Sequence, residues 1–88
     1  MIQANQAYRI HKLFRLQYEP AQQAWVLLYP EGMIKLSDSA SAILRMLNGE
    51  RTVAELIAEL QAQFPEADTL ADDVTEFLGE AYGKKWIC

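Results

Sequence analysis

The stretch AWVLLYPEGMIKL, residues 24–36, decides the fold of this chain. Nine of its thirteen residues are apolar or aromatic, and only Glu31 and Lys35 are charged. Its first six residues, 24–29, are apolar on both faces of a pleated strand and rich in aromatic and β-branched types, which predicts a central β-strand. A band this apolar belongs either to the hydrophobic core or to a surface that another molecule covers.

The segments on either side of this strand predict a three-stranded antiparallel meander. Pro30 and Gly32 favour a tight turn, because the φ of Pro30 is fixed and Gly32 tolerates a left-handed backbone. Residues 33–36 then form a short strand that pairs back on the central one. Before it, residues 14–18 (FRLQY) alternate between apolar and polar side chains, which predicts a half-buried first strand.

Beyond residue 36 the apolar period lengthens to that of a helix, which predicts three helices. Their start signals are Ser37, the capping box Thr52 with Glu55, and Thr69 with Asp72. The first two stop at Asn48-Gly49 and at Pro65. The apolar stripes are Ala40, Ile43, Leu44 and Leu47; Val53, Leu56, Ile57, Leu60 and Phe64; and Leu70, Val74, Phe77, Leu78 and Tyr82. The tail KKWIC is expected to fold back, because Trp86 and Ile87 are costly to leave in water.

The composition is that of one small globular domain. Of 88 residues, 51% are hydrophobic and 23% are charged, and a chain of this length forms one domain. We expect a flexible N-terminal arm over residues 1–11 and a single domain over residues 12–88. No apolar run is long enough to cross a membrane, and the N-terminus has no signal-peptide core. A cytoplasmic protein without a membrane partner is therefore expected.

The charge is unevenly distributed along the chain. Residues 50–80 carry nine acids against one base, Arg51, whereas residues 1–18 carry three bases and no acid. An acidic surface repels nucleic acid phosphates, so no nucleic-acid partner is expected. The acidic residues form either a solvated helical face or a surface that attracts a basic segment of a partner.

The residues that enzymes use are scarce in this sequence. His11 is the only His and lies at the predicted arm, where an exposed side chain is a poor general base. Cys88 is the only Cys and has no neighbouring His. No metal-binding spacing and no Gly-rich phosphate loop occur. We therefore expect a protein that is not an enzyme and that binds no cofactor and no metal.

Two other classes of protein share single features with this chain. The Asp38-Ser39 pair at a helix start resembles the attachment site of acyl carrier proteins, with Ser39 as the attachment serine, but those proteins are four-helix bundles without preceding strands. The other interpretation of Ser37, Asp38 and Ser39 is that they cap the first turn of the helix. Three helices with strands also suggest a winged-helix nucleic-acid-binding domain. A recognition helix needs a basic face, and the predicted third helix is acidic.

A meander leaves its first and third strands as sheet edges. Residues 33–36 contain one Lys and no Pro, and so have few of the features that protect an edge. Their backbone groups are therefore open to an added strand from a peptide, and we expect Ile34 to supply one of the free N–H donors. The alternative is that the third helix or the C-terminal tail covers this edge.

Several of these motifs together resemble one family. The segments LLYPEGMIKL, SASAIL and GERTVAELI are similar to those of PqqD, the pyrroloquinoline quinone (PQQ) synthesis protein D family, and the resemblance extends from Arg15 to Ile87. One departure is Asn48-Gly49, where Asp-Gly is expected; Asn serves the same turn. The resemblance implies an α+β fold: a small winged-helix-like domain with a three-stranded antiparallel meander followed by three α-helices.

The resemblance also implies a function. The family is one of non-catalytic peptide chaperones that resemble leader-peptide recognition elements, bind the precursor peptide PqqA and present it to the radical S-adenosylmethionine (SAM) enzyme PqqE. The iron–sulfur clusters and SAM belong to that enzyme. The peptide is expected to add a strand along the third strand, in a groove walled by the third helix. The residues expected to contact it are Met33, Ile34, Lys35 and Leu36 of the strand and Leu70, Asp73, Val74, Phe77 and Ala81 of the helix.

Overall fold

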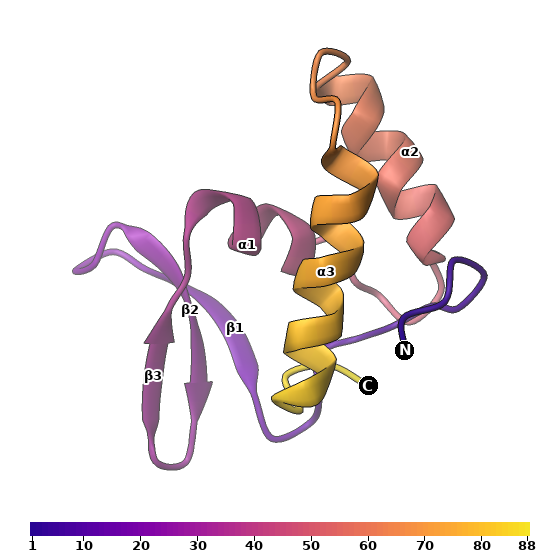
Figure 1. Cartoon of the computed structure of the whole chain (residues 1–88). Helices are drawn as coiled ribbons and strands as arrows, with labels where there is room; N and C mark the ends of the chain where they lie inside the picture. The colour runs from indigo at the N-terminus through magenta and orange to yellow at the C-terminus, as the bar shows by residue number, and fades with distance from the viewer.

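The computed structural model describes residues 1–88 and contains a three-stranded sheet followed by three helices (Figure 1). The strands are β1 (Arg15–Glu19), β2 (Ala24–Tyr29) and β3 (Gly32–Lys35). The helices are α1 (Asp38–Leu44), α2 (Val53–Gln63) and α3 (Leu70–Gly83). The sheet is antiparallel, in the order β1-β2-β3. The predicted α+β arrangement, a meander followed by three helices, is confirmed.

A two-residue turn joins β2 to β3. Tyr29 pairs with Gly32, so Pro30 and Glu31 alone form the turn. The prediction that Gly32 adopts a left-handed backbone is wrong, because Gly32 is already the first residue of β3. In the loop between β1 and β2, Gln23 is left-handed instead, with a φ of 51°.

The first two helices begin at the residues that the sequence predicts. The Ser37 hydroxyl accepts a hydrogen bond from the Ala40 N–H at 3.2 Å. At the start of α2 the Glu55 N–H donates to the Thr52 hydroxyl at 3.1 Å, and the Thr52 N–H donates to the Glu55 carboxylate at 2.8 Å. Both contacts satisfy backbone N–H groups that a helix start leaves without partners.

The end of α1 differs from the prediction, and α3 begins after Thr69 as predicted but without the expected side-chain cap. Helix α1 ends at Leu44, and Gly49, although left-handed with a φ of 78°, lies in the loop beyond it. Thr69 precedes α3 but caps no backbone N–H. Its hydroxyl instead donates to the Asp73 carboxylate at 2.9 Å, which holds this carboxylate beside the first turn of α3.

The hydrophobic core lies where the sheet and the three helices meet. Leu27 of β2, Leu44 of α1, Leu56 of α2 and Leu78 of α3 have no exposed surface. Burial of each such side chain contributes about 1.5–3 kcal/mol. One leucine from each of four elements therefore fixes the helices against the sheet.

Two residues of the predicted apolar stripes are exposed. Phe64 is 54% exposed, because α2 ends at Gln63 and the backbone of Phe64 has left the helical conformation. Tyr82 of α3 is also exposed, and its ring lies edge-on to Tyr8 with centroids 6.0 Å apart.

The N-terminal segment packs against the helices and the C-terminal tail. The Val53 N–H donates to the Gln6 carbonyl at 2.9 Å, and Arg9 and Cys88 exchange backbone hydrogen bonds of 2.9 and 3.0 Å. Tyr8 is 8% exposed and belongs to the core. The structure therefore differs from the free arm predicted over residues 1–11. The tail folds back, as predicted, and Ile87 is buried.

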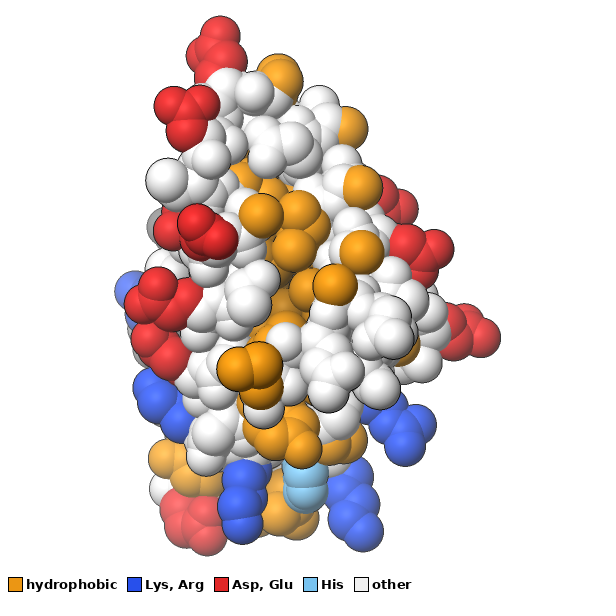
Figure 2. All heavy atoms as spheres, turned by 45° about the vertical axis from the view of Figure 1, so that its right-hand side comes forward, with side chains coloured by type: hydrophobic (Ala, Val, Ile, Leu, Met, Phe, Trp, Pro, Cys, Tyr) orange, Lys and Arg blue, Asp and Glu red, His pale blue; other side chains and the backbone are white.

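On the face seen in Figure 2, most acidic side chains lie apart from most basic ones. Figure 2 shows an apolar stripe with acidic side chains on both sides, and Lys, Arg and the His gathered towards its lower end. Pairing of residues 9–11 with residues 86–88 brings the bases of the N-terminal segment near Lys84 and Lys85. None of the three helices is both long and apolar enough to cross a bilayer.

Candidate functional site

The outer edge of β3 is not paired with any other segment of the chain. Strand β3 pairs with β2 only, and the two isolated bridges join other segments, Ala7 with Thr52 and Ile10 with Ile87. The C-terminal tail, which was one possible cover for this edge, pairs with residues 9–11 instead. The backbone groups on the outer side of β3 are therefore open to an added strand.

The sheet register shows which backbone groups face outward. Opposed residues in an antiparallel ladder alternate between hydrogen-bonded and non-hydrogen-bonded pairs. The Leu36 N–H donates to the Trp25 carbonyl at 2.9 Å, so the pairs at Ile34 and Gly32 are also hydrogen-bonded and point towards β2. The N–H and C=O groups of Met33 and Lys35 consequently point to the open edge. The expectation that Ile34 supplies a free edge donor is wrong by one residue.

The side chains of the predicted strand residues lie in different surroundings. Met33 is 44% exposed and Lys35 is exposed. Ile34 is half-buried against the core, and Leu36 is buried. Since side chains alternate across a strand, Ile34 and Leu36 help to hold β3 on the helices, whereas Met33 and Lys35 lie on the other face.

The predicted residues of α3 also differ in how far their side chains are buried. Val74 is buried and Leu70 half-buried, and both line a pocket, as does the exposed Asp73. Phe77 is half-buried and lies in a second, shallower pocket. Ala81 is 1% exposed, so its side chain is part of the core and is not available to a ligand. The structure thus brings together Leu70, Asp73, Val74 and Phe77 but not Ala81.

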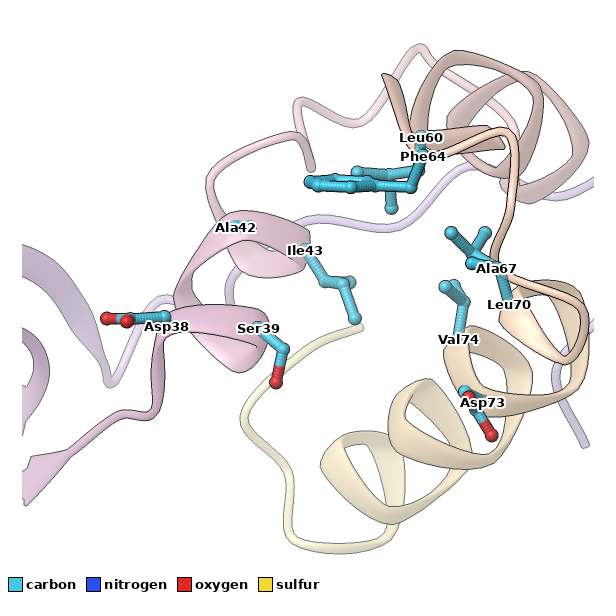
Figure 3. Close-up of a pocket in the computed structure, with 10 residues that line it drawn as sticks. All are labelled: Asp38, Ser39, Ala42, Ile43, Leu60, Phe64, Ala67, Leu70, Asp73 and Val74. Carbon is cyan, nitrogen blue, oxygen red and sulfur yellow. The ribbon is translucent and has the colours of Figure 1, made fainter. Parts of the chain in front are cut away.

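The larger pocket has a volume of about 410 Å³ and lies between α1, the end of α2 and the start of α3 (Figure 3). Its walls are mostly apolar, and polar groups lie on its rim. No residue of β3 lines it, so the wall opposite Leu70 and Val74 is α1 and not β3 as predicted. The lining residues are Asp38, Ser39, Ala42, Ile43, Leu60, Phe64, Ala67, Leu70, Asp73 and Val74.

The second pocket continues along α3 and is acidic. Asp73 lines both pockets, and with Glu76 and Glu80 it places three carboxylates around Phe77. The ion pair of the structure, Arg51 with Glu59 at 2.8 Å, lies on a different segment. These three carboxylates therefore have no basic partner within the chain. An acidic α3 also argues against the nucleic-acid-binding alternative.

Of the residues that line the larger pocket, sequence reasoning named only Leu70, Asp73 and Val74 as site residues and missed the rest, among them Ser39, Ala42 and Phe64. Ser39 and Ala42 are small residues on the α1 side of the pocket, and the Phe64 ring extends from the end of α2 towards α1 (Figure 3). Their spacing of three residues places Ser39 and Ala42 on one side of α1. An aromatic residue directly before Pro65, at a helix end, was the signal that Phe64 could lie outside the core.

The acidic groups near the site carry no metal-binding arrangement. No group of three or more His, Cys, Asp or Glu side chains is placed to hold a metal ion. The carboxyl whose pKa is clearly lowered is Glu55, because its hydrogen bonds with Thr52 favour the charged form. Glu55 lies in the capping box of α2 and not in either pocket.

An antiparallel meander with an unpaired β3 edge, followed by three helices that enclose an apolar pocket, defines a small α+β domain with surfaces suited to binding. The model of the family described as coenzyme PQQ synthesis protein D (PqqD) matches residues 24–87. The chain belongs to the PqqD family.

Curated relatives agree with this assignment over nearly the whole chain. The PqqA binding protein of Azotobacter vinelandii is 49% identical over 83 residues, which cover 94% of this chain and 90% of the relative. That of Pseudomonas syringae pv. tomato is 57% identical over 77 residues, covering 88% and 79%. These names describe binding proteins, and the family is accordingly non-catalytic.

A solved structure has the same fold. The solution NMR structure of the PqqD truncation of Methylobacterium extorquens PqqCD, described as a functional and stand-alone RiPP (ribosomally synthesized and post-translationally modified peptide) recognition element, has a TM-score of 0.79 to this chain. The match covers 100% of this chain and 95% of the other at 22% identity. At this identity the likeness establishes the fold alone.

Proposed function

We propose that this protein is a non-catalytic peptide chaperone of PQQ biosynthesis that binds the precursor peptide PqqA. The observation that carries the proposal is the open edge of β3, where Met33 and Lys35 direct N–H and C=O groups outward. Relatives of about 50% identity that are named PqqA binding proteins support it.

In the proposed complex PqqA adds a fourth strand to the sheet. The peptide backbone forms hydrogen bonds with the outward N–H and C=O groups of Met33 and Lys35, and each of these bonds contributes about 0.5–1.5 kcal/mol net. Its side chains extend towards Leu70, Asp73, Val74 and Phe77 of α3. Ordering of the peptide offsets much of this gain. We expect a Kd in the micromolar to sub-micromolar range, about −8 kcal/mol or slightly stronger.

The bound peptide is then presented to the radical SAM enzyme PqqE. Micromolar binding suits this step, because a peptide held more tightly would leave the chaperone slowly. The iron–sulfur clusters and SAM reside in the enzyme, and the domain itself holds the peptide extended in the cytoplasm. Retention of PqqE by the immobilised protein, with and without PqqA, measures this partnership.

Hydrogen exchange read by NMR tests the binding mode directly. Addition of PqqA to the 15N-labelled protein should slow exchange of the Met33 and Lys35 amides, because both gain acceptors. The Ile34 amide already bonds β2 and serves as the internal control. Binding with unchanged exchange at Met33 and Lys35 would place the peptide elsewhere.

Proline substitutions provide the matched functional test. Lys35→Pro removes an outward N–H of β3, and Tyr18→Pro removes one from the outer edge of β1, where the same alternation applies. Lys35→Pro should weaken PqqA binding at least tenfold, about 1.4 kcal/mol, while Tyr18→Pro retains it. Equal effects of the two substitutions would point to a general loss of the sheet and not to β3.

A further inference from the structure

The apolar pocket between α1 and α3 is left unfilled by the chain itself. A surface pocket of about 410 Å³ remains open between Ile43, Leu60 and Val74. Phe64 borders this space and is 54% exposed, and Leu70 is half-exposed. Leaving such surface in water is unfavourable, so a bound apolar group would be stabilised there.

The small side chains of α1 account for the open space. Ser39 and Ala42 line the α1 side of the pocket, and Leu70 and Val74 line its α3 side (Figure 3). Larger residues at these two positions would reach α3 and close the gap. A volume of this size lies in the range of small-molecule pockets, about 300–1,000 Å³, and it accommodates a large apolar side chain.

The mouth of this pocket is negatively charged. The Asp73 carboxylate is positioned at 2.9 Å by the Thr69 hydroxyl and lines both pockets of α3. Glu76 and Glu80 continue the acidic surface, and Phe77 between them offers an aromatic face. Carboxylates without a basic partner attract Lys or Arg, and an aromatic face adds to that attraction.

We propose that these two pockets determine which peptide sequence is bound. A large apolar side chain of the peptide inserts between α1 and α3, and a nearby Lys or Arg of the peptide lies against Asp73, Glu76 and Glu80. The inference rests on the proposed docking of PqqA on β3. Residue Lys35 ends β3, and Asp38 and Ser39 follow within four residues. A peptide that extends beyond the Lys35 end of the edge therefore reaches the α1 wall directly.

Helix geometry limits the spacing of the two side chains in the peptide. Asp73 and Glu80 are seven residues apart, which corresponds to roughly 10 Å along a helix axis. An extended peptide rises about 3.3 Å per residue. The basic residue is thus expected within about three residues of the apolar anchor.

Pocket-blocking variants test the apolar part of the proposal. Ala42→Leu should weaken PqqA binding by about tenfold or more, since the anchor side chain loses its burial. Ala58→Leu is the matched control, because Ala58 is exposed on α2 and lines neither pocket; its Kd should stay within about twofold of the wild type. Ser39→Tyr, at an exposed rim position, is a second blocking variant. Circular dichroism checks the fold of each.

Charge variants test the basic part. Asp73→Asn should weaken binding about threefold at low salt, as expected for an exposed ion pair, and the effect should vanish at high salt. PqqA peptides with each large apolar residue changed to Ala and each Lys or Arg changed to Gln locate the two side chains. Only a basic residue within about three positions of the anchor should show coupling with Asp73→Asn in a double-mutant cycle.

The outcomes separate this inference from the proposed function. If Ala42→Leu, Ser39→Tyr and Asp73→Asn all bind PqqA like the wild type while the Met33 and Lys35 amides still become protected, the pocket inference is overturned and the chaperone function stands. If the wild type does not bind PqqA, both are overturned. Loss of binding with Ala42→Leu, together with salt-sensitive coupling at Asp73, supports the inference.

Discussion

Removal of the Tyr8 side chain should destabilise the whole domain. Tyr8 is 8% exposed and packs edge-to-face with Tyr82. A buried tyrosine removes on the order of 150 Å² from water, which at about 25 cal/mol per Å² amounts to about 4 kcal/mol. Large-to-small substitutions of buried aromatic residues cost about 3–5 kcal/mol. We therefore expect Tyr8→Ala to lower the free energy of unfolding by about 4 kcal/mol.

This loss is large relative to the stability of a domain of this length. At about 0.05–0.15 kcal/mol per residue, a chain of 88 residues has an unfolding free energy of about 4–13 kcal/mol. With a urea m-value of about 1.5 kcal/mol per M, the midpoint should fall by about 2.5 M. Urea titration followed by circular dichroism measures this shift at constant m.

Two further variants separate packing from other effects. Tyr8→Phe keeps the ring and loses only the hydroxyl that accepts the Gln3 N–H at 3.3 Å, so its cost should be about 0.5–1 kcal/mol. Tyr18→Ala removes an exposed tyrosine and should cost about 1 kcal/mol or less. A Tyr8→Ala midpoint equal to that of Tyr18→Ala would refute the packed N-terminal segment and restore the flexible arm that the sequence predicts.

Three other substitutions have defined expected outcomes. Thr52→Ala should lower the free energy of unfolding by about 1 kcal/mol at pH 7, measured by thermal or urea unfolding. The lowered pKa of Glu55 gives stability that is present above its unfolded pKa and is lost as pH falls through the folded pKa. The variant should therefore lose less stability between pH 5 and 3 than the wild type, and an unchanged pH slope would contradict this. Gly49→Ala should cost about 1 kcal/mol, because a φ of 78° is strained for alanine; no change in the unfolding midpoint would mean that the loop relaxes. Arg45→Gln removes a guanidinium 4.7 Å from the Trp25 ring centre and should lower the free energy of unfolding by about 0.5–1 kcal/mol. Arg45→Lys is the control that keeps the charge. Equal stability of the wild type and both variants would rule out a stabilising contact.

Local signals predicted most of the fold. Ser37 and the Thr52–Glu55 box cap their helices as expected, because a cap depends on residues within one turn. The change in apolar period at residue 36 separated strands from helices for the same reason. The register of β3 was predicted wrongly, because the sequence analysis counted Gly32 as part of the turn. Only Pro30 and Glu31 form it, so Met33 rather than Ile34 has its N–H outward.

Contacts between distant segments were not predictable from pattern. Tyr8 and Ile10 alternate with polar residues over too few positions to identify a strand, and their partners are residues near 50 and 87. The pocket forms because Ser39 and Ala42 of α1 lie opposite Leu70, which is 31 and 28 residues away in the sequence. Helical spacing placed Leu70, Val74 and Ala81 on one face, but only the tertiary packing shows that Ala81 is part of the core.

The position of Cys88 makes the molecule simple to label. Its thiol is exposed and is the only one in the chain, while its backbone is fixed to Arg9 by two hydrogen bonds. Figure 1 shows the C-terminus on the far side of α3 from β3. A maleimide dye or a biosensor tether joined there would sit away from the β3 edge, so every immobilised copy would present that edge to solution in the same orientation.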